Sequence, residues 1–182
     1  MDYRQVFLNN RKWVAEKKSE NPLYFKDLAL GQNPEYMVIS CCDSRAPIEL
    51  ITGAEPGDMF VHRNIANLVS EADNNLMAVL EYALNVFKVK YIIVCGHTDC
   101  AGIRTVYDTD HAGSLEEWLK TARVVKESDP GASYNELIEL NIKEQCRNLS
   151  RISIIEESIK ERGFPLIHGW LYKIESGELV EV

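Results

Sequence analysis

The sequence contains the stretch Tyr91-Ile92-Ile93-Val94-Cys95-Gly96-His97-Thr98-Asp99-Cys100, and its first half decides the fold. Residues 91–95 form an almost wholly apolar run rich in β-branched side chains, which is typical of an interior strand of a parallel sheet. A similar run, Tyr36-Met37-Val38-Ile39, stops just before Cys41. Met59-Phe60-Val61 follows a turn sequence and predicts another strand.

Helical patterns lie before and between these strands. Apolar residues recur at helical spacing from Tyr3 to Val14, and a second short helix is expected from Leu23 to Leu30. A third helical pattern runs from Leu76 to Phe87. We therefore predict one α/β domain over residues 1–182, in which helices flank a central, mostly parallel sheet and residues 1–30 or so form an N-terminal helical arm.

The C-terminal half is predicted to be mostly helical. Ser114-Leu115-Glu116-Glu117 and Ser133-Tyr134-Asn135-Glu136 each match a capping box, the pattern in which a serine and a glutamate close a helix N-terminus. The segments Leu166 to Ile174 and Leu179 to Val182 then predict two strands joined by a turn at Ser176-Gly177.

Charge and composition narrow the function. The 182 residues include 28 acidic and 20 basic side chains, for a net charge of -8, which argues against nucleic acid or an anionic membrane as partner. No apolar run approaches the roughly 20 residues of a membrane span, and the start of the chain lacks a signal-peptide pattern. Five cysteines, an odd number without framework spacing, fit a reducing compartment, so we expect a cytoplasmic protein with a small-molecule substrate.

Three residues that suit a metal ion follow two of the predicted strands. Cys41 ends the first, while His97 and Cys100 follow the strand at residues 91–95. The carboxyl ends of parallel strands meet at one edge of a sheet, so the three side chains can converge. Thiolate and imidazole are the donors that zinc prefers, and three ligands leave a fourth position open, as in catalytic rather than structural sites.

The motifs Cys41-x-Asp43-Ser44-Arg45 and Gly96-His97-x-x-Cys100 resemble the paired signatures of the β-class carbonic anhydrases. The similarity continues through residues 56–67, 140–151 and 168–170 and so covers nearly the whole chain. The resemblance implies a Zn²⁺ enzyme that hydrates carbon dioxide reversibly to bicarbonate and a proton by means of a zinc-bound hydroxide. Because two thiolates cancel the charge of the metal, we expect activity that rises above neutral pH.

The resemblance also implies roles for Asp43 and Arg45. Asp43 accepts the hydrogen of the hydroxide, and Arg45 keeps that carboxylate ionised. Alternatively, Asp43 itself occupies the fourth zinc position and gives a closed, inactive state. The residues leave both states open.

Five further residues match the substrate pocket of the family: Gln32, Phe60, Ile65, Tyr82 and Gly102. Without the resemblance, these side chains would be interpreted as a loop glutamine and ordinary core residues. Ala101 replaces a glycine that usually precedes Gly102 in the family.

A bicarbonate-inhibited subgroup of the family uses a tryptophan, an arginine and a tyrosine near the active site. Arg63 and Tyr172 match two of these residues as possible regulatory positions, but Val38 stands where the tryptophan would be. This difference puts the inhibitory pocket in doubt. Arg63 also has a structural interpretation, as part of a core or interface ion pair.

The other cysteines and one histidine have simpler interpretations. We predict that Cys42 is a buried bystander, because successive strand side chains point to opposite faces. Cys95 and Cys146 lie in apolar contexts typical of core thiols, and His111 is expected to be solvated.

The apolar stripe of the N-terminal arm needs a covering surface, and in the family this arm packs across a neighbouring subunit. We therefore expect a homodimer or homotetramer, whose pockets can take residues from both chains. Two other functions remain open: hydrolysis of a related heterocumulene such as carbon disulfide or carbonyl sulfide, and a non-catalytic zinc-binding module.

Overall fold

A computed structural model describes residues 2–106 and 113–182, so His111 lies outside the described residues. The chain divides into two compact units, Met1–Asn33 and Pro34–Val182. The first unit holds α1 (Tyr3–Glu20) and α2 (Tyr24–Leu28), as predicted, with α1 continuing beyond Val14. None of the described residues of α1 is buried, and the exposed side chains include Phe7.

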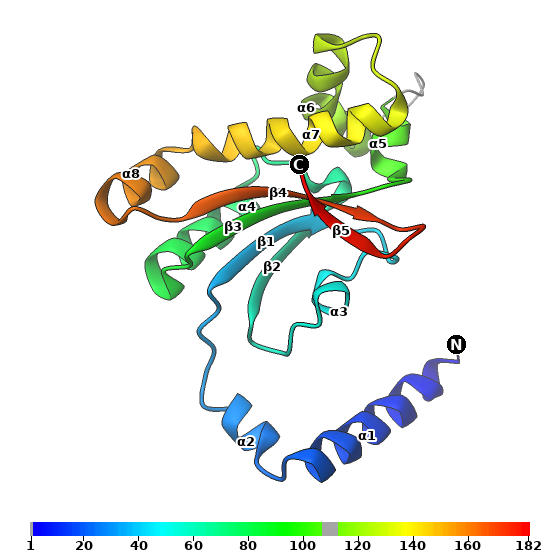
Figure 1. The fold of residues 1–182 in the computed structure, drawn as a ribbon, viewed down its shortest axis with the longest axis vertical. Coiled ribbons are helices and arrows are strands. Elements are labelled where there is room, and N and C mark those ends of the chain that lie inside the picture. The colour runs from blue at the N-terminus through cyan, green and yellow to red at the C-terminus, as the bar shows by residue number, and fades with distance from the viewer. Residues whose placement is uncertain (1, 107–112) are drawn as a thin grey trace. The chain divides into compact units, whose positions relative to one another are not determined.

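The second unit is built on a five-stranded sheet in the order β2-β1-β3-β4-β5 (Figure 1). The pairings among the first four strands of this order are parallel, and β4 and β5 are antiparallel, which confirms the predicted mostly parallel sheet. The strands are β1 (Tyr36–Cys41), β2 (Met59–Asn64), β3 (Tyr91–His97), β4 (Leu166–Lys173) and β5 (Glu178–Glu181).

Helices connect these strands. They are α3 (Ile48–Thr52), α4 (Asn74–Tyr82) with the π-helical turn η2 (Ala83–Phe87), α5 (Ala101–Thr105), α6 (Ser114–Ser128), α7 (Tyr134–Ser150) and α8 (Ser153–Arg162). A short 3₁₀ turn, η1 (Ile65–Asn67), follows β2. The capping box at Ser133 is confirmed, but the one at Ser114 is wrong, because Gly113 is the N-cap and Ser114 is already helical.

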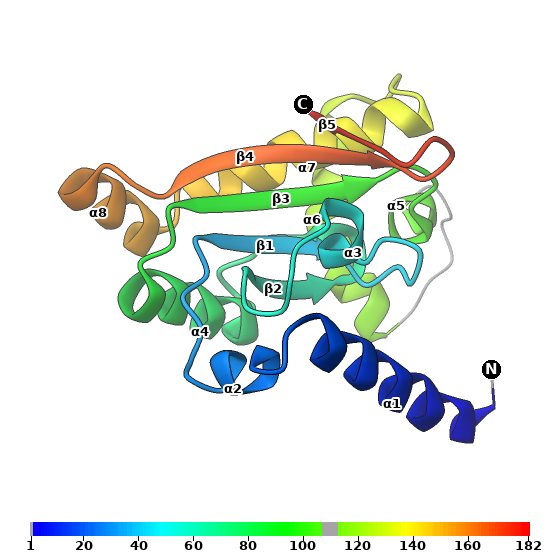
Figure 2. The same ribbon diagram turned by 60° about the horizontal axis from the view of Figure 1, so that its bottom comes forward.

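The two faces of the sheet are covered unequally. Apolar residues of β1 and β3 such as Ile39 and Val94 face a large core formed with α4, α6, α7 and α8. The other face carries a smaller core, in which Val38 and Ile93 pack with Ile48 of α3. Figures 1 and 2 show α7 and α3 on opposite sides of the sheet. Each large aliphatic side chain buried in this way stabilises the fold by about 1.5–3 kcal/mol.

The order of the strands fixes the place of the site. The chain leaves β1 toward β2 on one side and leaves β3 toward β4 on the other, so the connections diverge between β1 and β3. In open α/β sheets, ligands bind at such a point, outside the carboxyl ends of the strands. The last residues of these two strands are Cys41 and His97. Within the described part of the chain, every helix is too short or too polar to cross a membrane.

Candidate metal centre

Three buried side chains converge where β1 and β3 end. Cys41 closes β1, His97 closes β3, and Cys100 is the N-cap of α5. Their ligand atoms all lie within 4.8 Å of one another, and the two Sγ atoms are 3.8 Å apart. Two ligands of a tetrahedral ion with metal–sulfur bonds of about 2.3 Å lie about 3.8 Å apart, so the spacing fits a metal ion.

The His97 ring is held with one nitrogen free for a metal. Its Nδ1 lies 2.8 Å from the backbone oxygen of Thr98, which can only accept, so Nδ1 carries the proton and donates it. The Nε2 atom is buried and has no hydrogen-bond partner among the described residues. A buried polar atom without a partner is unusual in a folded protein, and a metal ion would supply one.

The surroundings of the two cysteines favour a thiolate. A hydrogen bond with Cys100 lowers the pKa of Cys41 to about 4 against the opposing effect of burial, with help from His97 and from the amides of Asp43 and Ala66. The same shared proton raises the pKa of Cys100. Burial lowers the pKa of His97, but contact with the Cys41 thiolate outweighs it and raises that pKa overall. Negative charge therefore gathers where a cation would bind.

A carboxylate faces these ligands. Asp43 Oδ2 lies 3.8 Å from His97 Nε2. Arg45 holds this carboxylate at both oxygens, with Nε 3.0 Å from Oδ1 and Nη2 2.8 Å from Oδ2, and its backbone amide donates to Oδ1 at 2.9 Å. These hydrogen bonds lower the pKa of Asp43 to about 2, so Asp43 is ionised throughout the physiological range.

Arg63 supports the loop that carries Asp43 and Arg45. Its guanidinium donates to the backbone oxygens of Cys41 at 3.0 Å, Asp43 at 2.7 Å and Ala46 at 3.2 Å. Within the described part of this single chain, Arg63 therefore binds backbone oxygens rather than a core carboxylate, and an ion pair at an interface stays a prediction. Tyr172 lies on β4 beside His97 and packs against the smaller core, which also contains Val38.

A small cavity of about 240 Å³ adjoins the group formed by Cys41, His97 and Cys100, and several predicted residues line it. Ile65 and Gly102 line it beside Cys41 and Asp43, together with Leu115. A Cβ atom on Gly102 would lie 2.8 Å from Ile65 Cγ2, so a glycine is needed for this close approach. Cys42 also lines the cavity and is exposed, so its prediction as a buried residue is wrong: β1 ends at Cys41, and the next residue leaves the sheet.

Phe60 and Tyr82 lie away from this cavity. Phe60 pairs with Met37 near the start of β1, four residues before the position that pairs with Cys41, or about 13 Å along the strand. It forms an aromatic cluster with Tyr82 and Phe87, with ring centroids 5.0–5.9 Å apart.

Gln32 belongs to the first unit and is exposed there. Within a single chain, Ile65 and Gly102 therefore lie at the site, whereas Phe60 and Tyr82 lie outside it.

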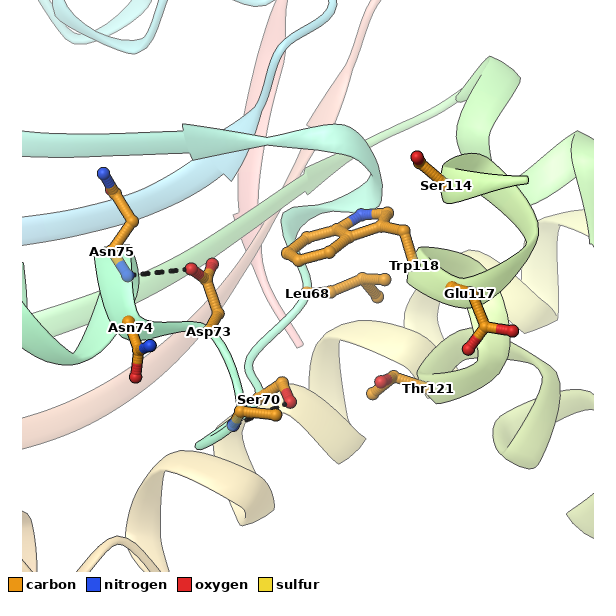
Figure 3. Close-up of a pocket in the computed structure, with 10 residues that line it drawn as sticks. Leu68, Ser70, Asp73, Asn74, Asn75, Ser114, Glu117, Trp118 and Thr121 are labelled. Carbon is orange, nitrogen blue, oxygen red and sulfur yellow. Dashed lines mark hydrogen bonds between the residues drawn. The ribbon is translucent and has the colours of Figure 1, made fainter.

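A larger cavity of about 580 Å³ is lined by Trp118 and Leu68 among others, and none of Cys41, His97 and Cys100 lines it (Figure 3). Asp73 and Trp118 face each other across it. The Trp118 indole nitrogen donates to the backbone oxygen of Ile65 at 2.8 Å, so this helix α6 residue holds one wall of the smaller cavity in place.

Sequence reasoning missed the supports behind the site. On α7, Asn141 donates to the backbone oxygen of Ala66 at 3.1 Å, and Gln145 accepts from the amide of Val69 at 2.9 Å. Both side chains are fully buried, so they fix the turn after β2 from inside the core. Amide side chains at positions four apart in an otherwise apolar helix face were the signal that could have found them.

Comparisons with known proteins identify the family and agree with the fold. Residues 36–179 match the carbonic anhydrase family. A carbonic anhydrase of Emericella nidulans is 42% identical over 98% of this chain and 82% of its own length. The chain therefore belongs to the β-class carbonic anhydrases, a family of enzymes, which sets aside the interpretation as a non-catalytic module.

Solved structures give the same result. A tetrameric β-carbonic anhydrase from Sordaria macrospora superposes with a TM-score of 0.93 and 36% identity, covering 99% of this chain and 96% of that one. A β-carbonic anhydrase from Aspergillus fumigatus gives a TM-score of 0.93 and 37% identity, covering 99% and 90% of the two chains. Other relatives include mitochondrial and chloroplastic proteins of Arabidopsis thaliana, so the cytoplasmic location stays a prediction.

Proposed function

We propose that this enzyme hydrates carbon dioxide reversibly to bicarbonate and a proton, with Zn²⁺ held by Cys41, His97 and Cys100. The observation that carries the proposal is the convergence of these three ligand atoms within 4.8 Å beside an ionised carboxylate and a small cavity. Zinc, when bound, lowers the pKa of a coordinated water toward about 7 and so makes a hydroxide nucleophile available near neutral pH.

Asp43 orients the nucleophile. With a pKa of about 2, its carboxylate accepts hydrogen bonds and donates none at working pH. It therefore accepts a hydrogen bond from the attacking oxygen. This hydrogen bond turns a lone pair of that oxygen toward carbon. The new carbon–oxygen bond forms as one C=O π bond opens, and the proton released in the cycle passes to solvent.

Arg45 keeps Asp43 in this role. A carboxylate that turned toward the metal would compete for the fourth position and close the site. The two side-chain hydrogen bonds from Arg45, at 2.8 and 3.0 Å, hold the carboxylate in a fork and support the open state.

The cavity suits a small apolar substrate. Ile65 and Leu115 supply apolar walls, and the glycine at 102 leaves room close to Ile65. Carbon dioxide has no net dipole, so an apolar wall desolvates it at little cost while Asp43 faces the reacting oxygen.

We further propose that Gln32, Phe60 and Tyr82 complete the pocket from a second copy of the chain. In support, Phe60 lies about 13 Å along the strand from the position that pairs with Cys41, Tyr82 stacks against Phe60, and Tyr82 is 49% exposed. The exposed apolar residues of α1 and the tetrameric state of the Sordaria macrospora protein also favour an oligomer, a homodimer or homotetramer.

Stopped-flow hydration of carbon dioxide by the zinc-loaded protein tests the substrate. We expect rate acceleration that is lost when the metal is removed by a chelator and restored by zinc. Release of sulfide from carbon disulfide or carbonyl sulfide, with negligible hydration of carbon dioxide, would assign the site to the alternative heterocumulene hydrolase.

A further inference from the structure

We propose that Asp99 is a positioning residue that acts through Arg45 to hold the Asp43 carboxylate in place. The proposal rests on the function proposed above. Asp99 occupies one of the two positions that the His97-x-x-Cys100 spacing leaves unspecified, so it is a property of this sequence rather than of the ligand motif.

The guanidinium of Arg45 is shared between two aspartates. Its Nε and Nη2 atoms donate to Asp43, while Nη1 donates to Asp99 Oδ2 at 3.0 Å. Nη2 also lies 3.0 Å from the backbone oxygen of Asp99. Arg45 is therefore held through a second edge of its guanidinium, formed by Nη1 and Nη2, which limits the rotations by which a long, flexible side chain would leave the carboxylate.

The backbone of Asp99 makes this double contact possible. Its φ of 54° lies in the left-handed region, which aspartate tolerates better than most residues. In this conformation, both the carboxylate and the carbonyl of Asp99 face one guanidinium. The short turn that delivers His97 and Cys100 from β3 thereby also fixes the position of Arg45, on the loop after β1.

A second arginine, Arg104, also binds the Asp99 carboxylate. Its second carboxylate oxygen, Oδ1, accepts from Arg104 Nη2 at 2.5 Å. The guanidinium of Arg104 lies over the ring of Tyr134, 4.6 Å from the centroid, and the Tyr134 hydroxyl donates to the backbone oxygen of Cys100 at 2.8 Å. Each carboxylate oxygen of Asp99 thus binds a different arginine. One of them, Arg104, in turn packs against Tyr134 of α7.

The exposure of the Asp99 and Arg45 side chains distinguishes a positioning role from a role in folding. The side chains of Asp99 and Arg45 are 56% and 46% exposed, and ion pairs at such exposure contribute little to overall stability. Removal of the Asp99 side chain should therefore leave the protein folded and zinc-loaded. Its effect should appear in the placement of Arg45 and Asp43.

A double-mutant cycle on the zinc-loaded full chain tests the proposal. We expect Asp99→Ala to lower kcat about tenfold, the scale on which partners of site residues act, with zinc content unchanged and Tm lowered only slightly, since alanine is less favourable than aspartate at a φ of 54°. Asp99→Glu should restore part of the loss. Because Asp99 acts through Asp43, adding Asp99→Ala to Asp43→Asn should cause no further loss. Glu144→Gln, which breaks the 2.8 Å pair with Arg147 on α7, serves as the matched control.

Crystal structures of the wild type and Asp99→Ala give a readout that is independent of turnover. We expect Arg45 to leave Asp43 in the variant. An unmoved Arg45, or losses that add fully in the double variant, would overturn the proposal. If the wild type did not hydrate carbon dioxide at all, the proposed function would fail, while the position of Arg45 in the two structures would still decide the role of Asp99.

Discussion

Arg45 Nη2 donates to Asp43 Oδ2 at 2.8 Å, and this carboxylate oxygen lies 3.8 Å from the free ring nitrogen of His97. This contact links the loop after β1 to the end of β3. The two strands are neighbours in one sheet, so they place the Asp43 carboxylate beside His97. The strand β3 positions His97, and the hydrogen bonds from Arg63 to backbone oxygens hold the loop that carries Asp43.

The metal-binding assignment predicts a difference between two adjacent cysteines. Cys41→Ser should lose most of the bound zinc, because serine replaces a buried thiolate ligand. Cys42→Ser, next in the chain but exposed, should keep full zinc stoichiometry. Zinc per chain, measured by inductively coupled plasma mass spectrometry, provides the check. Equal zinc contents in the two variants would point to other ligands.

The close packing at Gly102 predicts a loss of stability on enlargement. Gly102→Ala would place a methyl group 2.8 Å from Ile65 Cγ2 and 3.1 Å from Ala66 Cβ, and such overpacking costs about 1–3 kcal/mol. Thermal unfolding should show a lower Tm, and Ile65→Ala should recover part of the loss in the double variant. Ala101→Gly, at the exposed neighbouring position, should change Tm less. A larger loss from Ala101→Gly would show that the packing argument is mistaken.

The pKa of Asp43 predicts how stability depends on pH. Hydrogen bonds from Arg45 lower this pKa from 3.8 to about 2 in the folded state. A group with a lowered pKa stabilises the fold above its unfolded pKa, and this contribution is lost as the pH falls from about 4 to about 2. The difference in unfolding free energy between the wild type and Asp43→Asn should therefore shrink over this range. Urea unfolding at pH 5 and pH 3 measures it, and a difference independent of pH would refute the linkage.

The proposed pocket predicts that activity depends on assembly. Phe7 is 52% exposed on α1, so Phe7→Asp should weaken packing against a second copy without disturbing the metal ligands. Analytical ultracentrifugation should show a shift toward monomer, and kcat/KM should fall in parallel while zinc is retained. Phe7→Leu keeps an apolar side chain and is the control. A monomeric variant with full activity would contradict a shared pocket.

The sequence predicts the strands and the convergence of Cys41, His97 and Cys100 well, because both depend on local patterns. Apolar runs mark β1 and β3, and a residue at the end of each strand must reach the same edge of a parallel sheet. The convergence of Cys41 and His97 follows from these two facts alone.

Other features depend on tertiary geometry that no local pattern carries. The capping box at Ser114 fails because the backbone enters α6 through Gly113, at a φ of 78°. Cys42 is exposed because β1 stops one residue earlier. The role of Asp99 depends on a left-handed turn and on an arginine 54 positions away in the sequence, so it emerges only from the fold.

Hydration kinetics against pH, with zinc content determined on the same samples, test the central claim most directly. The wild type should accelerate carbon dioxide hydration with kcat rising above neutral pH. Asp43→Asn should retain zinc but turn over about 100-fold more slowly or worse, the scale of the loss when a reacting group is misplaced by about 1 Å. Equal turnover by zinc-loaded wild type and Asp43→Asn would contradict the account.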